Sequence, residues 1–296
     1  MSKQLRAGLL LTLTALIWGT AFVAQSVGMN YVGPFTYLFS RSLIGGIILI
    51  PLIKFMKKDS PASDQTGQNK ILIKGGILCG IALFAASIFQ QIGIQYTTVG
   101  KAGFITSLYI IIVPVLSILW GKKASKKIWL SVSIAVIGMY FLCMNGESQI
   151  NIGDIFVLLC AFGFSLHILV IDKFSPKVNS IKLSCLQFWI CALISFFPMM
   201  ILEKPEMSHI ISAWAPILYA GALSSGAGYT LQIIAQKDIE PTIASLICSL
   251  ESVFSVIFGW IILNQTLSAQ ELFGCVLVFL GVILTQIPDR KKARPQ

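Results

Sequence analysis

The sequence predicts an all-α integral membrane protein with ten transmembrane helices in two inverted five-helix repeats. Three observations predict this fold: ten long apolar stretches, a weak likeness between the first five and the last five, and basic residues concentrated in alternate connections. A hydrocarbon core about 30 Å thick requires about 20 apolar helical residues. The expected spans are Gly8–Gly28, Phe35–Met56, Lys74–Gln95, Ala102–Trp120, Ile128–Asn145, Gly153–Ile171, Ile181–Leu202, Ile210–Leu231, Pro241–Leu263 and Leu272–Pro288.

Composition and charge support a multi-pass membrane protein. Hydrophobic residues make up 56% of the chain and charged residues 11%, whereas soluble domains carry about 25% charged residues. All Lys and Arg residues except Arg41, Lys101 and Lys204 lie in alternate connections or at the span ends beside them. The positive-inside rule therefore places both termini in the cytoplasm and the chain in the plasma (inner) membrane. The net charge of +10 is read as a topology signal with contact to anionic membrane lipids, and no nucleic acid partner is expected.

The N-terminus and the cysteines need separate interpretations. Lys3 and Arg6 before an apolar run resemble a signal peptide, but the run Gly8–Gly28 is too long and its counterpart in the second half is an internal span. We expect the cysteines to be small buried apolar residues, because they fall in apolar spans, in odd number and without CxxC spacing. Disulfides, metal sites and cofactors are therefore not predicted. The cysteines are Cys79, Cys143, Cys160, Cys185, Cys191, Cys248 and Cys275.

The second half of the chain repeats the first with small changes of register. A shift of 146 residues aligns Ala15–Thr20 with Ala161–Leu166 and Arg41 with Gln187. At a shift of 141, a pair of glutamines in the third span meets a similar pair in the eighth, and further matches follow in the fourth and fifth spans. Each match is weak alone, and their common order along the chain indicates a repeat.

We expect two domains, residues 1–146 and 147–296, each with five helices. Because five is odd, the second repeat begins on the opposite side of the membrane and is inverted relative to the first. Inverted repeats in secondary transporters place the substrate site near the midplane, between the halves. The repeat thus favours a transporter before any residue is given a role.

Several segments resemble one transporter family. They are Gly100–Tyr109, Val113–Ser117, the pair Trp18-Gly19, Arg41, and Leu250–Phe254. Together they are similar to EamA-type members of the drug/metabolite transporter superfamily, and the likeness covers the whole chain. The resemblance implies ten helices and carriage of small molecules; members move amino acids, sugars, nucleotide-linked compounds and drugs.

The chain departs from that family pattern in two places. Members usually have proline after the glutamate of helix nine, where this chain has Ser252. They also tend to have a glutamate shortly after that helix, where this chain has Gln265. A charged contact at Gln265 is therefore not expected.

Three ionisable residues lie within the expected spans: Arg41, His167 and Glu251. Each costs about 2.5–3.5 kcal/mol to insert unless it is paired or hydrated. Glu251 is about 15 Å deep, which places it near the midplane of the membrane. It is either a structural carboxylate or a contact for substrate or protons, and the second interpretation permits proton coupling. Arg41 either pairs with Glu251, caps carbonyls or attracts an anionic substrate group. His167 is either a packing residue or a proton relay.

The remaining candidates are uncharged. The glutamines at i, i+4 spacing either line a cavity or bond neighbouring helices, and Trp18 either walls the cavity or packs in the core. Pro114 is expected to kink helix four, as a gate or only as a shape feature. The glutamines are Gln91, Gln95, Gln232 and Gln236.

These observations predict a secondary active transporter that works by alternating access. The expected partner is a small-molecule substrate such as an amino acid, moved across the plasma membrane with export as the favoured direction. The alternatives are an intramembrane enzyme or a channel. An enzyme is disfavoured because His167 and His209, the two histidines, lie far apart in the sequence and form no metalloprotease motif; a channel is disfavoured because no filter loop is present.

Overall fold

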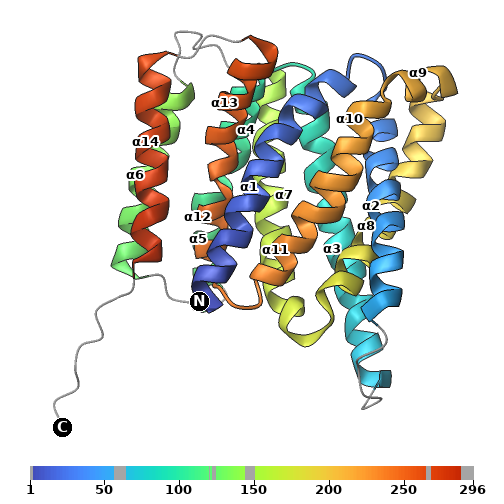
Figure 1. Cartoon of the computed structure of the whole chain (residues 1–296), viewed down its shortest axis with the longest axis horizontal. Coiled ribbons are helices and arrows are strands. Elements are labelled where there is room, and N and C mark those ends of the chain that lie inside the picture. The colour runs from blue at the N-terminus through green and yellow to red at the C-terminus, as the bar shows by residue number, and fades with distance from the viewer. Residues whose placement is uncertain are drawn as a thin grey trace.

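The computed structural model describes residues 3–56, 65–119, 121, 125–143, 151–264 and 268–287. Over these residues every regular element is helical (Figure 1). Within the described residues, seven helices are long and apolar enough to cross a membrane, which confirms the predicted all-helical membrane class. The seven are Lys3–Gly28, Pro34–Phe55, Gly67–Ile94, Val99–Leu119, Ile152–Lys177, Ser180–Glu203 and Pro241–Leu263.

The helices of the first half follow the predicted spans. The fourth span is divided into two helices, α4 and α5. In chain order the helices are α1 (Lys3–Gly28), α2 (Pro34–Met56), α3 (Gln65–Ile94), α4 (Val99–Ser107), α5 (Tyr109–Leu119) and α6 (Lys126–Cys143).

The second half is less regular. Its eighth span changes from α-helical to π-helical winding and back, and its ninth is divided like the fourth. The elements are α7 (Ile152–Phe174), η2 (Ser175–Lys177), α8 (Ser180–Pro198), η3 (Met199–Glu203), α9 (Met207–Ser212), α10 (Trp214–Leu218), η4 (Tyr219–Tyr229), α11 (Thr230–Ala235), α12 (Pro241–Cys248), α13 (Leu250–Leu263) and α14 (Ala269–Gln286).

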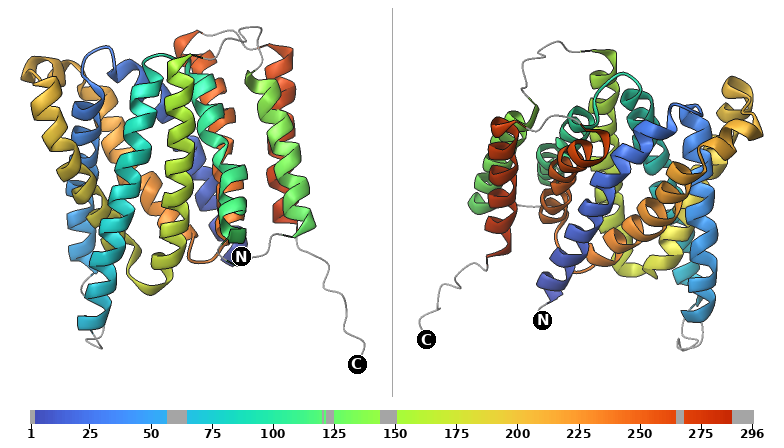
Figure 2. Two further views of the ribbon diagram at one scale, coloured as in Figure 1. Left: turned by 180° about the vertical axis from the view of Figure 1, so that it is seen from behind. Right: turned by 45° about the horizontal axis from the view of Figure 1, so that its top comes forward.

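The long helices run side by side, and their connections gather at two ends of the bundle (Figure 1). We call the end where α4 and α7 begin the outer end, and the end where α1 begins the inner end. The helix α14 finishes at the inner end, so the first and last described helices share it (Figure 1). The pair α6 and α14 stands at one edge of the bundle in all three views (Figures 1 and 2), and α2 packs against α8 near the other.

Small residues allow the helices to approach closely. On α3, a methyl group added at Gly76 would lie 2.4 Å from Leu186 of α8, and one added at Gly80 would lie 2.6 Å from Ile190. Such contacts give the van der Waals attraction that lipid cannot replace. The close packing of α3 on α7 and α8 helps to fix the position of the helices that surround the site.

Candidate functional site

Helix four is interrupted near the middle of the bundle. The α4 segment ends at Ser107 and α5 begins at Tyr109, with Leu108 between them. The N–H of Leu108 donates to the carbonyl of Ile105 at 3.1 Å, a tighter turn than the α-helix makes. Pro114, which is predicted to kink helix four, lies inside α5, beyond the break. Its missing N–H removes the helical bond to the carbonyl of Ile110, which weakens the turn between the break and Pro114.

Helix nine is interrupted in a similar place without a proline. A series of serine hydroxyls donates to the carbonyl three residues earlier: Ser249 to Leu246 at 2.7 Å, Ser252 to Ser249 at 2.7 Å and Ser255 to Ser252 at 2.8 Å. Hydroxyl groups that bond the preceding turn compete with the helical ladder and bend the helix. The serines thus account for the break between α12 and α13, and the Ser-x-x-Ser spacing was its signal in the sequence.

Replacing Ser252 with proline should change stability little. Ser252 is the third residue of α13, and the first turn of a helix tolerates proline. Two bonds to the carbonyl of Ser249 are lost, one from the N–H of Ser252 at 3.0 Å and one from its hydroxyl at 2.7 Å, which together correspond to about 1–2 kcal/mol. Thermal unfolding in detergent should show a melting point within a few degrees of wild type. Val256→Pro, in the interior of α13, is the matched control and should destabilise by about 3 kcal/mol; equal losses would contradict the account.

The two broken helices meet at their breaks. Tyr109, the first residue of α5, donates its hydroxyl to Oε1 of Glu251, the second residue of α13, at 2.7 Å. Each residue lies about ten residues into its broken helix, or about 15 Å at 1.5 Å per residue. Glu251 is 4% exposed, and its place in the first turn of α13 favours a carboxylate. The geometry therefore puts a buried carboxyl group at half the depth of the bundle.

Glu251 and Tyr109 line a narrow central cavity. The space open to the centre of a water molecule is about 20 Å³, which is room for water but not for a metabolite. Gln25, near the outer end of α1, and Gln232, near the inner end of α11, both belong to the lining, so the cavity extends along the bundle axis. Its lining residues are Trp18, Phe22, Gln25, Arg41, Gln90, Tyr109, Phe164, Ile168, Ser224, Tyr229, Gln232 and Glu251.

Arg41 lines the same cavity as Glu251. It is 3% exposed, its Nη1 donates to Oε1 of Gln25 at 3.3 Å, and its Nε has no hydrogen-bond partner among the described residues. Within the part of the chain that the structure describes, Arg41 and Glu251 form no ion pair. The direct Arg41–Glu251 pairing considered from the sequence is therefore not the arrangement found. The guanidinium instead keeps a donor that a ligand could use.

Trp18 and Tyr229 form an aromatic wall of the cavity. Their ring centroids lie 4.6 Å apart, and Nε1 of Trp18 donates to the carbonyl of Ser224 at 3.3 Å. Five of the lining residues are aromatic. The wall therefore offers flat apolar surface beside the charged groups.

The predicted glutamines take different places. Gln232 lines the cavity, and its Oε1 has no hydrogen-bond partner among the described residues. Gln91 is buried, and its Nε2 donates to the carbonyl of the lining residue Gln25 at 3.5 Å. Gln236 is buried and donates to the carbonyl of Ile168 at 3.1 Å. Gln95 does not line the cavity: α3 ends at Ile94, so the i, i+4 face is not continued and Gln95 is exposed.

His167 lies behind the aromatic wall and is not a lining residue. Its Nε2 is 3.0 Å from Oε1 of Gln187, and its ring packs edge-on to Tyr229 at 5.7 Å between centroids. Gln187 is the residue that the repeat aligns with Arg41. His167 and Gln187 therefore form a buried polar pair in the inner half of the bundle, whereas the guanidinium of Arg41 lies in the outer half.

Sequence reasoning missed several lining residues. Tyr109 was noticed only as part of a family-like segment, and Gln25 could have been found as an amide within an apolar span. Phe164 had a clear signal, because the 146-residue shift aligns it with Trp18. Gln265, where the sequence departs from the family pattern, lies outside the described residues.

Two findings concern metal and disulfide chemistry. Six cysteines are buried free thiols in the described structure: Cys79, Cys160, Cys185, Cys191, Cys248 and Cys275. Among the described residues, no group of three or more His, Cys, Asp or Glu side chains is placed to hold a metal ion. The side chain of Cys143 lies outside the described part.

The comparison with protein families decides the family. The model of the EamA-like transporter family matches the chain twice, over residues 5–144 and 151–287. The chain belongs to the EamA-like transporter family. The predicted resemblance is therefore confirmed, and this EamA-like chain is a member of a transporter family, with multi-pass membrane character.

Its relatives carry transporter names. An uncharacterized transporter of Archaeoglobus fulgidus is 32% identical over 96% of this EamA-like chain and 87% of the relative. The uncharacterized transporter YetK of Bacillus subtilis is 22% identical over 100% of the chain and 90% of the relative. An S-adenosylmethionine/S-adenosylhomocysteine transporter of Chlamydia muridarum is 21% identical over 92% of the chain and 89% of the relative.

The fold is similar to that of a solved crystal structure. It superposes with a TM-score of 0.75, covers 94% of this chain and 96% of the other, and is 17% identical in sequence. At that identity the likeness shows the fold of this EamA-like chain alone.

Proposed function

We propose that the chain is a secondary active transporter that exports small amphipathic metabolites, amino acids first among them, across the plasma membrane by alternating access. The observation that carries the proposal is the site itself. Glu251 and Arg41, both buried and not paired with each other, line one cavity where two broken helices meet. Broken helices that present polar groups at midplane depth are a recurrent way for secondary transporters to build substrate sites.

The proposed architecture is ten transmembrane helices in two inverted repeats, residues 1–146 and 147–296. Its support is the symmetry of the packing. The second and seventh helices, α2 and α8, pack together, as do the fifth and tenth, α6 and α14. The third packs on the sixth (α3 on α7), and in the same way the eighth packs on the first (η4 and α11 on α1). Both breaks, at Leu108 and Ser249, fall at matching points of the two repeats.

The lining favours a zwitterion with an apolar body. The carboxyl group of Glu251 suits a substrate ammonium group, and the guanidinium of Arg41 suits a carboxylate. Trp18 and Tyr229 offer a face for an apolar or aromatic side chain. The Chlamydia relative is named for S-adenosylmethionine, which itself contains an amino acid group, and this agrees with the proposed class.

Alternating access also agrees with the small volume of the cavity. Space of about 20 Å³ cannot hold an amino acid, so a substrate requires the two halves to separate on one side. When no substrate is bound, the carboxyl group of Glu251 can exchange a proton instead, which would couple transport to protons. In this mechanism the partners are the substrate, protons and the surrounding lipid.

The proposed topology predicts the sides on which cysteines react. The exposed residues Gln68, at the inner end of α3, and Tyr96, after its outer end, are suitable positions for single cysteines. With the N-terminus in the cytoplasm, Gln68→Cys should react with an impermeant maleimide only from the cytoplasmic side. Tyr96→Cys should react only from outside. The reverse pattern would overturn the orientation.

Proteoliposomes test the transport function itself. Purified protein should give saturable flux of one or more labelled amino acids that discriminates between L and D forms. Flux that does not saturate would indicate a channel, and chemical conversion of the solute would indicate an enzyme. Thermal stabilisation in detergent identifies which amino acids to assay, because a ligand that binds only the folded state raises the melting point.

A further inference from the structure

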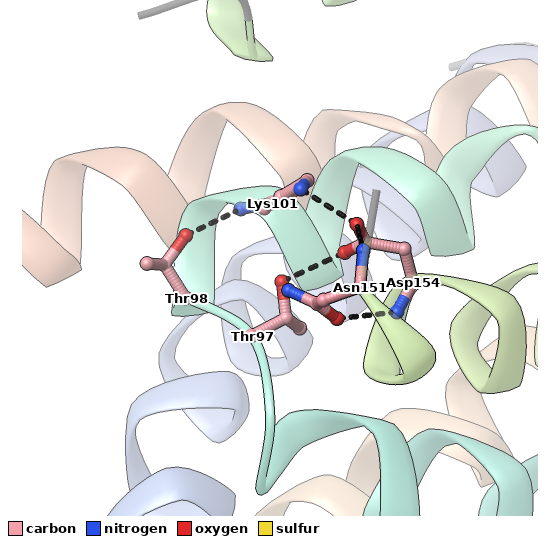
Figure 3. Close-up of polar contacts among 5 residues, drawn as sticks. All are labelled: Thr97, Thr98, Lys101, Asn151 and Asp154. Atoms are coloured by element: carbon pink, nitrogen blue, oxygen red, sulfur yellow. Dashed lines mark hydrogen bonds and ion pairs between the residues drawn. The ribbon is translucent and has the colours of Figure 1, made fainter. Parts of the chain in front are cut away.

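A cluster of polar contacts at the outer end joins the two halves of the chain (Figure 3). Asp154, in the first turn of α7, accepts hydrogen bonds from the hydroxyl of Thr97 at 3.0 Å and from the N–H of Asn151 at 2.9 Å. Nζ of Lys101, in the first turn of α4, lies 2.6 Å from Oδ2 of Asp154. Asp154 in turn donates its N–H to Oδ1 of Asn151 at 3.0 Å. The carboxylate therefore caps its own helix and also holds the start of α4.

The sequence explains why these groups meet. Thr98 is the N-cap of α4 and accepts the N–H of Lys101 at 3.3 Å, while Asn151 and Asp154 form a capping box at the start of α7. The two helix N-termini lie at the same end of the bundle (Figure 1). Thr97 and Lys101 belong to the first half of the chain, and Asn151 and Asp154 to the second.

The cluster stands above the cavity. An apolar group fills the space between them and includes Val99 of α4, Val157 of α7 and Phe22 of α1. Phe22 also lines the cavity. Together, the apolar group and the polar cluster close the outer end of the path to Glu251.

The two matching positions at the inner end carry no charged side chain. The 141-residue shift that aligns the two helix breaks puts Thr242 in the place of Lys101. The 146-residue shift that aligns Trp18 with Phe164 puts Gly8 in the place of Asp154. Neither replacement is ionisable. Lys237, at the inner end, bonds to the backbone carbonyl of Val178 at 2.9 Å, whereas the outer end joins two side chains of opposite charge, Lys101 and Asp154.

We propose that Thr97, Lys101 and Asp154 form an outer latch, which must open before the cavity is reached from the outer end. The break at Leu108 lets α4 move away from α7 while α5 stays in place. Because the matching positions at the inner end carry no such ion pair, the empty carrier is biased towards the state that is closed to the outside, and it loads from the inner end, as an exporter requires. This inference rests on the alternating access proposed above and names the contacts that bias it.

Accessibility of one cavity residue tests the latch without any substrate. Ser224→Cys places a thiol in the lining, and an impermeant maleimide is applied to the outer end in sealed vesicles. The chain without Ser224→Cys measures labelling of the buried native cysteines. Lys101→Gln should raise the labelling rate roughly three- to tenfold, the range expected for a partly exposed charge-assisted contact. Thr97→Val should give a smaller increase, and Lys101→Arg should stay near the starting rate.

A matched control separates the latch from loss of a helix cap. Ser268 and Glu271 form a similar capping box at the outer end of α14, so Glu271→Gln should leave labelling of Ser224→Cys unchanged. An unchanged rate in Lys101→Gln, or an equal increase in Glu271→Gln, overturns the latch. If Lys101→Gln increases labelling but liposomes show no flux, the latch stands and the transport proposal fails. If liposomes show saturable flux but labelling does not change, the transport proposal stands and the latch fails.

Discussion

Glu251→Gln should reduce transport about 100-fold or more in kcat/KM, the loss expected when one partner of a desolvated charged contact is removed. The amide keeps the size of the side chain, and its oxygen can still accept a hydrogen bond from the hydroxyl of Tyr109. In the wild-type chain that hydroxyl donates to the carboxylate at 2.7 Å. Expression in the membrane should therefore stay near the wild-type level. Proteoliposome flux of the best amino acid substrate, with protein amount matched, measures the effect.

The control for that variant is a carboxylate outside the cavity. Glu271 is also buried, at 8% exposed, and caps α14. Glu271→Gln should leave flux within about twofold of wild type, because Glu271 lies outside the cavity lining and the amide oxygen can still accept the N–H of Ser268. Normal flux in Glu251→Gln would contradict its role and leave a site built from glutamines and aromatic residues.

The hypothesis that Glu251 couples transport to protons makes a separate prediction for Glu251→Gln. If Glu251 carries a proton in exchange for substrate, a pH gradient should drive uptake in wild-type vesicles. The same gradient should have no effect on the residual flux of Glu251→Gln. If the residual flux follows the gradient as wild type does, the coupled proton resides on another group. His167 would then be the next residue to substitute, because it lies next to the aromatic wall.

The sequence predicted the helices well because insertion in lipid leaves few alternatives. A run of about 20 apolar residues must satisfy its own backbone hydrogen bonds, and a helix does so. The helix breaks were harder to predict. Leucine is not a helix-breaking residue, so the break at Leu108 follows from packing and from the weakened turn near Pro114. The break at Ser249 depends on hydroxyl groups that also occur in unbroken helices.

Site residues were predictable when their chemistry was out of place in lipid. Glu251, Arg41 and Gln232 were found because a charge or an amide in an apolar span needs a reason. Gln95 was misplaced because the i, i+4 rule holds only inside a helix, and α3 ends one residue earlier. Tyr109 was overlooked because an aromatic residue in a span looks like ordinary packing, and only its 2.7 Å contact with Glu251 distinguishes it.

Arg41→Gln should remove the preference for substrates that carry a carboxylate. The substitution copies Gln187, the residue at the matching position of the second repeat. The amide is two bonds shorter than the guanidinium and loses the 3.3 Å bond to Gln25, so membrane expression is measured beside flux. The free Nε of Arg41 and its positive charge are lost, and KM for an amino acid should rise about tenfold or more, equivalent to about 1.4 kcal/mol. Arg41→Lys keeps the charge without the planar fork and should give a milder defect.

Comparing each amino acid with its decarboxylated amine makes this test specific to Arg41. Wild type should prefer the amino acid, whereas Arg41→Gln should transport the two at similar rates, because the amine never contacted the guanidinium. Arg41→Lys should retain part of the preference. If Arg41→Gln still selects the carboxylate as strongly as wild type, Arg41 holds Gln25 and the helix packing in place, and the anionic end of the substrate must be recognised by other donors in the lining, such as the hydroxyl of Tyr229 or the amide of Gln90.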